Sequence, residues 1–229
     1  MDKKTFIDNV KQVMNDADLY NDIDVSLIGA DTTLLDYHID KVYVDAWKSL
    51  YNRKTETGMY IVPRELFEKK DFKDAKLYSS IHTGDGYVIL PSDYYDIHTF
   101  RMEGWSVPVT EALDIDHYLY SRQSNEFAKG KWIRPLCFES SKNIKDESTG
   151  SYKVRKVLEY YSLPKGEEHK ILTAIYFPVI KPLEQGVVGQ DSELVRGLVF
   201  LCGSLIYAIQ QRLELSNVLE GIAYKTLNR

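Results

Sequence analysis

The sequence predicts an α+β fold, in which an antiparallel helical bundle from both chain ends carries an inserted antiparallel β domain. Three observations lead to this prediction: helical periodicity near the start, short β-prone segments with turns in the middle, and a long apolar helix near the end. Helices and strands that are segregated along a chain are typical of this class. We expect residues 1–75 to give the first helices, 76–180 the β domain, and 181–229 the helices that complete the bundle.

Two helical patterns occupy the N-terminal part. Apolar residues recur at helical spacing within residues 3–16 and again within residues 32–52. The polar, Asp-rich residues 18–30 predict a loop between them, and Asp31 or Thr32 can cap the second helix. Pro63 is typical of the first turn of a helix and predicts a short third one.

The middle of the chain alternates between β-prone runs and turn residues. Two runs are the strongest strand candidates, and a hairpin-type turn at 164–167 joins them. Residues 140–150 are rich in Ser and Lys, and we interpret them as a charged loop. The expected strands are 76–81, 87–90, 94–102, 105–109, 132–139, 152–163 and 171–179.

The apolar run near the C-terminus is the most informative segment. Residues 192–213 are expected to form one helix, and a last short helix starts near Ser216. A surface helix has one apolar stripe, but here Val199, Phe200 and Tyr207 lie outside it. The run is shorter than the roughly 20 apolar residues of a membrane span.

That helix is therefore either central to one domain or buried between neighbouring subunits. Three helical partners from the same chain would leave part of it uncovered, which favours a subunit contact. The candidates for subunit packing are Leu198, Phe200, Leu201, Leu205 and Tyr207.

Composition gives weaker indications. The net charge of -5 argues against nucleic-acid binding by bulk charge. The 17 tyrosines indicate either interface residues or a tyrosine-rich core. Cys137 and Cys202 are expected to be buried free thiols in a reducing compartment. The N-terminus lacks the apolar core of a signal peptide, so we expect synthesis in the cytosol.

No segment carries a recognisable catalytic, metal or cofactor motif. Residues 83–86 lack the length and the lysine of a phosphate loop and predict a turn. Residues 114–117 have metal-type side chains, but no second cluster completes a coordination shell. Cys137 lies between apolar residues and predicts a packed thiol rather than a nucleophile. We expect no catalytic residue, no metal and no cofactor, and an enzyme of unknown type remains an alternative.

One motif carries a resemblance. Leu90-Pro91-Ser92-Asp93-Tyr94-Tyr95, followed by the β run 97–102, resembles the entry into the β domain of head-to-tail adaptor proteins of tailed phages. Short-tailed adaptors share this order of helices, β domain and long apolar helix, and the strands at 158–161 and 174–178 fit it too. The overall sequence pattern of the chain is similar to that of the connector ring proteins of crAss-like phages.

The resemblance implies a homo-oligomeric ring, typically a dodecamer, at the head-tail junction of the virion. Such a ring docks under the portal protein, carries tail or further ring proteins, and contacts DNA transiently in its channel, with no membrane involved. A mildly acidic channel would repel phosphates and let DNA slide.

Residues 213–229 are interpreted in two ways. Their apolar spacing fits helix-in-groove docking on the portal or a neighbouring subunit, through Leu215, Val218, Leu219, Ile222 and Tyr224. Alternatively, they pack on their own bundle. For the whole chain, the alternatives are a stopper, a tail terminator, a minor capsid protein, or a host regulatory or ligand-binding module.

Overall fold

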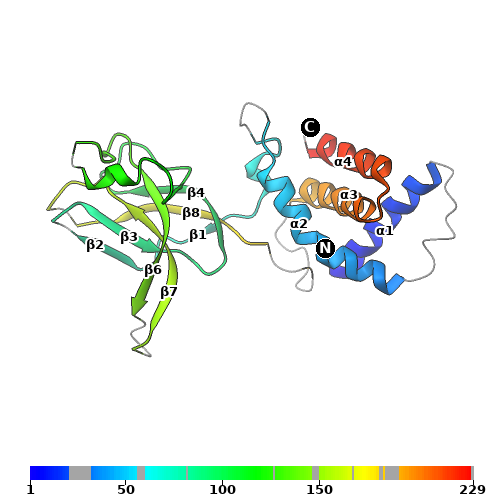
Figure 1. Ribbon diagram of the computed structural model, residues 1–229, viewed down its shortest axis with the longest axis horizontal. Coiled ribbons are helices and arrows are strands. Elements are labelled where there is room, and N and C mark those ends of the chain that lie inside the picture. The colour runs from blue at the N-terminus through cyan, green and yellow to red at the C-terminus, as the bar shows by residue number, and fades with distance from the viewer. Residues whose placement is uncertain are drawn as a thin grey trace. The chain divides into compact units, whose positions relative to one another are not determined.

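The computed structural model describes residues 1–20, 32–55, 60–80, 82–125, 127–145, 150–166, 168–180, 183 and 191–227. The fold is α+β, as predicted, with four α-helices and two β-sheets within these residues (Figure 1). The chain divides into two compact units. The helical unit comprises Met1–Glu68 and Ile180–Arg229, and the β unit comprises Lys69–Val179.

The helical unit is built around α3, which packs against each of the other three helices (Figure 1). Asp191 caps α3 by accepting a hydrogen bond from the Glu193 amide at 2.7 Å. The expected loop at 18–30 overlaps the end of α1, and its residues from 21 onward lie outside the described residues, as does Asp31. The helices are α1 (Lys3–Tyr20), α2 (Thr32–Asn52), α3 (Ser192–Ile209) and α4 (Leu213–Leu227).

The predicted single helix over 192–213 is wrong at its end. α3 stops at Ile209, and Gln211 adopts a left-handed conformation with φ of 62°. This conformation breaks the helical path. The last helix therefore begins at Leu213, three residues earlier than predicted. The short helix predicted at Pro63 is a single 3-10 turn, Arg64–Leu66.

Close contacts hold α3 in the centre of the helical unit. Tyr207 is fully buried and donates a hydrogen bond to the Met14 carbonyl at 2.7 Å, which joins α3 to α1. Ser204 donates to the Ser216 carbonyl at 2.9 Å, which joins α3 to α4. A Cβ at Gly197 would lie 2.6 Å from Leu227 Cδ1, so glycine allows α4 to approach closely.

Within the described residues, α3 is the one helix whose length and composition would suit a membrane span. Its 18-residue window is 61% buried inside the structure. Central helices of a folded domain have the same length and composition, so this feature is weak evidence for a span.

The β unit contains two sheets. The three-stranded sheet has the order β1-β8-β4, and the five-stranded sheet has the order β2-β3-β7-β6-β5. The prediction of an entirely antiparallel domain is wrong at one edge, because β5 pairs with β6 in parallel. The strands are β1 (Lys70–Asp71), β2 (Leu77–Ser80), β3 (Asp85–Ile89), β4 (Tyr94–Met102), β5 (Leu113–Asp114), β6 (Cys137–Lys145), β7 (Tyr152–Tyr160) and β8 (Ile171–Pro178).

Strand pairing departs from the prediction in two places. β7 and β8 do not form a hairpin, because β7 pairs with β3 and β6 while β8 pairs with β1 and β4. Residues 105–109 do not form a strand. Only a single bridge between Phe100 and Val109 is present there.

The predicted loop at 140–150 is wrong for its first half. β6 continues through residues 140–145 and pairs with β7, from Cys137 opposite Tyr160 to Lys145 opposite Tyr152. β3 reaches β7 only at residues 157–160. Residues 141–145 and 152–156 therefore form a two-stranded ribbon that projects from the sheet (Figure 1). We call this pair of segments the ribbon.

Aromatic side chains fill the core of the β unit. Phe100 stacks on Phe72 at a centroid distance of 6.0 Å and meets Trp105 edge-on at 5.7 Å. Trp105 in turn meets Tyr160 edge-on at 6.4 Å. Tyrosine abundance thus partly reflects the cores of both units, where the buried tyrosines are Tyr43, Tyr51, Tyr94, Tyr160, Tyr176 and Tyr207.

The Leu-Pro-Ser-Asp motif lies where the chain passes from β3 in one sheet to β4 in the other. Asp93 accepts hydrogen bonds from Lys70 Nζ at 2.5 Å and from Tyr176 Oη at 2.7 Å. Burial opposes ionisation, but these two donors outweigh it and lower the pKa of Asp93. The Asp93 carbonyl also accepts from the Val179 amide at 2.6 Å. The hydrogen bonds of Asp93 therefore connect the start of β4 with β1 and β8.

Candidate docking surfaces

An apolar groove lies between α1, α3 and α4 of the helical unit. Its volume is about 500 Å³, and seven of its eight lining residues are apolar. We call it the helical groove. It is lined by Val13, Asp16, Ala17, Phe200, Leu215, Val218, Leu219 and Ile222.

The groove follows from the spacing of apolar residues on α4. Leu215 and Leu219 are four residues apart, lie on one face, and are buried. Val218 and Ile222 form a second row around the helix, and their side chains remain 53% and 37% exposed. Phe200 of α3 is half-buried. The groove therefore has a covered floor and an open apolar wall that can receive an apolar side chain of a partner.

The predicted subunit-packing residues divide into two groups. Leu198, Leu201 and Tyr207 are buried by the chain itself. Phe200 and Leu205 remain half-buried, and only Phe200 lines the groove. Most of the apolar surface of α3 is thus covered inside the helical unit.

The predicted contact residues of 213–229 also include both buried and accessible side chains. α4 packs on α3 of its own unit through Leu215 and Leu219, while Val218 and Ile222 stay accessible. The Tyr224 ring lies under the Arg53 guanidinium at 4.3 Å, which holds it against residues that follow α2. α4 therefore packs on its own unit through part of its surface, docking on a partner stays a prediction, and residues 228–229 lie outside the described residues.

Sequence reasoning missed the α1 side of the groove. Val13 belongs to the predicted helix 3–16, but Val13, Asp16 and Ala17 were not predicted to be docking residues. The signal was present in part, because Val13 belongs to an apolar row near the end of α1. The sequence gives no direct indication that this row faces α4.

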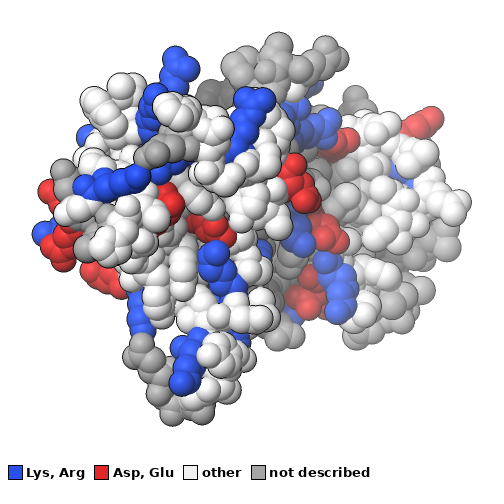
Figure 2. Space-filling view, turned by 60° about the vertical axis from the view of Figure 1, so that its left-hand side comes forward, with Lys and Arg blue, Asp and Glu red and all other residues white. Residues whose placement is uncertain are grey.

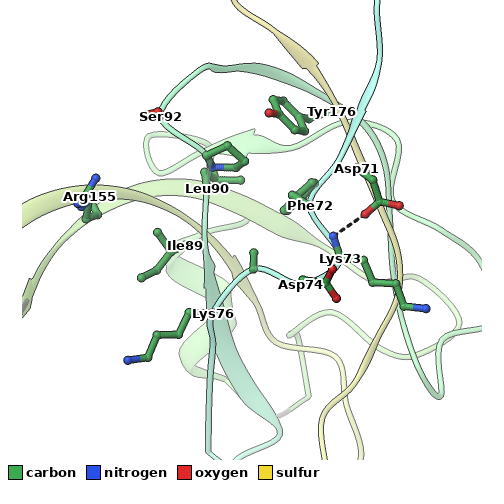
Figure 3. Close-up of a pocket in the computed structure, with 12 residues that line it drawn as sticks. Asp71, Phe72, Lys73, Asp74, Lys76, Ile89, Leu90, Ser92, Arg155 and Tyr176 are labelled. Carbon is green, nitrogen blue, oxygen red and sulfur yellow. Dashed lines mark hydrogen bonds between the residues drawn. The ribbon is translucent and has the colours of Figure 1, made fainter. Parts of the chain in front are cut away.

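A second concave site lies in the β unit and holds charged groups of both signs (Figure 3). Its volume is about 670 Å³. Arg155 and Lys76 lie on one side of it, whereas Asp71 and Asp74 lie on another. Asp71 accepts a hydrogen bond from the Lys73 amide at 2.6 Å, so it stabilises the local turn. The other lining residues are Phe72, Ala75, Ile89, Leu90, Pro91, Ser92 and Tyr176.

Two carboxyl groups with shifted pKa values lie elsewhere in the β unit. Glu139 is the acceptor of the Tyr94 hydroxyl, and burial raises the pKa of Glu139. Burial opposes ionisation of Glu159 too, but donors from Ser140, Tyr161 and Lys142 outweigh it and lower the pKa of that carboxyl. Their partners are side chains of the sheet, so these groups serve the fold.

The two cysteines and the residues of 83–86 and 114–117 are the remaining candidates for catalysis or metal binding. Burial raises the pKa of the Cys137 thiol and of the Cys202 thiol, which keeps both protonated and unreactive. Both are free and buried. Residues 82–84 form the turn that was predicted, and β3 begins at Asp85. Among the described residues, which include Asp114 and His117, no group of three potential metal ligands comes together.

Comparisons with known proteins do not identify a family for this chain. No protein-family model matches the sequence, and no curated protein shows significant similarity to it.

Proposed function

We propose that this chain is the subunit of a structural ring between the portal and the tail of a tailed phage. The ring would form a channel for DNA and a platform for tail attachment. The proposal includes a bundle made from both chain ends, with the β unit as an insertion between them. Its support is the order of helices and strands, the motif around Asp93, and the division into two compact units.

The helical groove is the observation that carries the proposal. A ring closes through a heterologous interface, in which a surface of one subunit meets a different surface of the next. The groove supplies one apolar half of such a contact. The β unit exposes large apolar side chains suited to the other half, namely Phe127, Trp132 and Ile133, which are 92%, 50% and 54% exposed.

Burial of the groove wall would stabilise the assembly. Covering one Val or Ile side chain contributes about 1.5–3 kcal/mol when burial is complete, and somewhat less for side chains that are already half covered. One groove per subunit is repeated around the ring, so modest contacts at each interface hold a closed assembly together.

Negative-stain imaging combined with light scattering tests this proposal. We expect rings with a central hole for the native chain, alone or with the portal protein of the same virus. Val218→Glu should give monomers with an unchanged circular dichroism spectrum, because Val218 is exposed in the single chain.

Leu213→Glu is the matched control. Leu213 lies on the same helix, is 63% exposed, and does not line the groove, so its rings should persist. Rings formed by Val218→Glu would contradict the role of the groove. Failure of the native chain to form rings, even on the portal, would contradict the proposed function.

A further inference from the structure

Positive charge is concentrated on the ribbon of the β unit. Residues 140–156 contain five basic and two acidic residues, a net charge of +3, which leaves −8 for the rest of the chain. Figure 2 shows Lys and Arg atoms on the projecting part of the β unit, and others on the upper side of the view. The basic residues of the described ribbon are Lys142, Lys145, Lys153, Arg155 and Lys156.

Two of these cations oppose each other directly. Lys142 pairs with Arg155 in the β6–β7 register, so both side chains point to the same face, and Lys153 shares that face. Like charges at opposite positions destabilise a sheet. Lys142 Nζ forms an ion pair with the Glu159 carboxylate at 3.0 Å, but no described carboxylate forms an ion pair with Arg155. An anion bound on this face would relieve the repulsion.

The second face of the ribbon is also basic. Lys145 and Lys156 lie there, and between them Tyr152 and Val154 are each 70% exposed. An acidic protein surface would meet only one face of the ribbon at a time. The major groove of B-DNA, which admits a two-stranded β-ribbon, has phosphates along both walls and can meet both faces.

The dimensions and side chains fit that groove. Five paired positions of β6 span roughly 16 Å at about 3.3 Å per residue. At the base of the ribbon, Arg155 also lines the charged pocket beside Lys76, which extends the basic path (Figure 3).

We infer that the ribbon inserts into the major groove of duplex DNA, with Lys145, Arg155 and Lys156 on the phosphates of both groove walls. This binding is sequence-tolerant, because phosphate contacts carry little sequence information. The inference goes beyond the proposed function and does not depend on ring assembly. The ribbon is complete in a single chain, and the helical groove contributes nothing to it.

Fluorescence anisotropy with a labelled 20-base-pair DNA tests the inference on the full chain. Three phosphate contacts predict a slope of about −2.7 for log affinity against log salt, or a fall of about 40-fold between 50 and 200 mM salt. Replacing Lys145 and Arg155 by Gln removes one cation from each face. The slope should then shrink to about −0.9, with weaker binding at 50 mM.

A double variant of Lys48→Gln and Lys225→Gln is the control, because it changes net charge equally at exposed lysines of the helical unit. It should bind DNA like the native chain. Val218→Glu should keep the ribbon-dependent part of binding, so loss of ring assembly and loss of DNA binding are distinguishable.

Duplex RNA sharpens the test, since its deep and narrow major groove excludes a ribbon. We expect at least tenfold weaker binding to it. Equal affinity for RNA and DNA would overturn groove insertion. Unchanged DNA affinity in the ribbon variant would overturn the whole inference, and would leave an acidic protein as the partner of this surface.

Discussion

The helical unit and the β unit leave different kinds of surface uncovered. In the helical unit, the exposed Val218 and Ile222 form an apolar wall beside a buried floor. In the β unit, the aromatic core is closed between two sheets, and the exposed extension is a basic ribbon. The difference separates two modes of binding, since apolar burial depends weakly on salt while exposed charges are screened by it.

Within each unit, side chains at neighbouring positions serve separate purposes. On α4, Leu215 and Leu219 complete the core, whereas Val218 lies one position away and remains exposed. On β7, residues 157–160 are buried, whereas residues 152–156 are exposed on both faces. Stability and docking are thus carried by different residues, and substitutions can separate them.

The largest expected effect concerns the core of the helical unit. Leu198 is fully buried, so Leu198→Ala should lower the free energy of unfolding by about 2–5 kcal/mol. Val218→Ala should change it by less than about 0.5 kcal/mol, because half of that side chain is already in water. Amide hydrogen exchange in α3, on dilute protein, measures both. Similar effects from the two variants would contradict the distinction between core and docking surface.

The next effect concerns the packing of the β unit. A Cβ at Gly86 would lie 2.2 Å from Tyr160 Oη and 2.6 Å from the Tyr78 carbonyl oxygen. Gly86→Ala should therefore destabilise β3 and β7 by about 1–3 kcal/mol, the usual range for overpacking. Amide exchange in those two strands measures it.

Gly221 of α4 provides the contrast, because an added Cβ there meets nothing within 4 Å. Gly221→Ala should stabilise α4 by up to about 1 kcal/mol through helix propensity. A neutral result for Gly86→Ala would show that the sheet relaxes around the extra methyl group.

Much of the helical unit could be predicted from the sequence, because helical periodicity is a local signal. The positions of α1, α2 and α3 follow from apolar rows and a capping residue. The break at Gln211 could not be predicted, because it depends on a left-handed conformation at a residue that rarely adopts it.

Strand pairing was less predictable, since it depends on partners far away in the sequence. β7 and β8 are adjacent in sequence order, yet they belong to different sheets. Residues 141–145 of the ribbon were interpreted as part of a charged loop, although residues 152–156 belong to a predicted strand. Among 141–145 only Ile144 is buried, so this part of β6 has no apolar alternation that would indicate a strand. The lysines of that segment were therefore assigned to a loop and not to a binding surface.

The groove was predictable in part. Leu215, Val218, Leu219 and Ile222 follow from apolar spacing, and Phe200 follows from its place outside the apolar stripe of α3; all five line it. Of the other candidates, Leu198, Leu201 and Tyr207 are covered by the chain itself, and Leu205 and Tyr224 do not line the groove. Spacing shows which residues share a helical face, but it does not show how closely α4 covers α3, which depends on Gly197 and Gly203.

The smallest expected effect is a difference in acid sensitivity between the units. The β unit buries His169, whose Nδ1 lies 2.7 Å from Tyr160 Oη, whereas the buried polar side chains described in the helical unit are Ser204 and Ser216. Burial lowers the pKa of His169, and the nearby Asp85 carboxylate opposes this only partly. The unfolded chain therefore binds a proton more readily than the folded one, so stability is full above about pH 6.5 and is lost as pH falls.

Between pH 7 and pH 5.5, amide exchange in β3 and β7 should accelerate, with a slope of at most about 1.4 kcal/mol per pH unit from one proton, after correction for the intrinsic pH dependence of exchange. His169→Gln should flatten this dependence, because glutamine does not titrate. The same measurement in α3 should show no comparable loss, since serine hydroxyls do not titrate in this range. An equal loss in native and His169→Gln proteins would assign the acid sensitivity to other groups of the β unit.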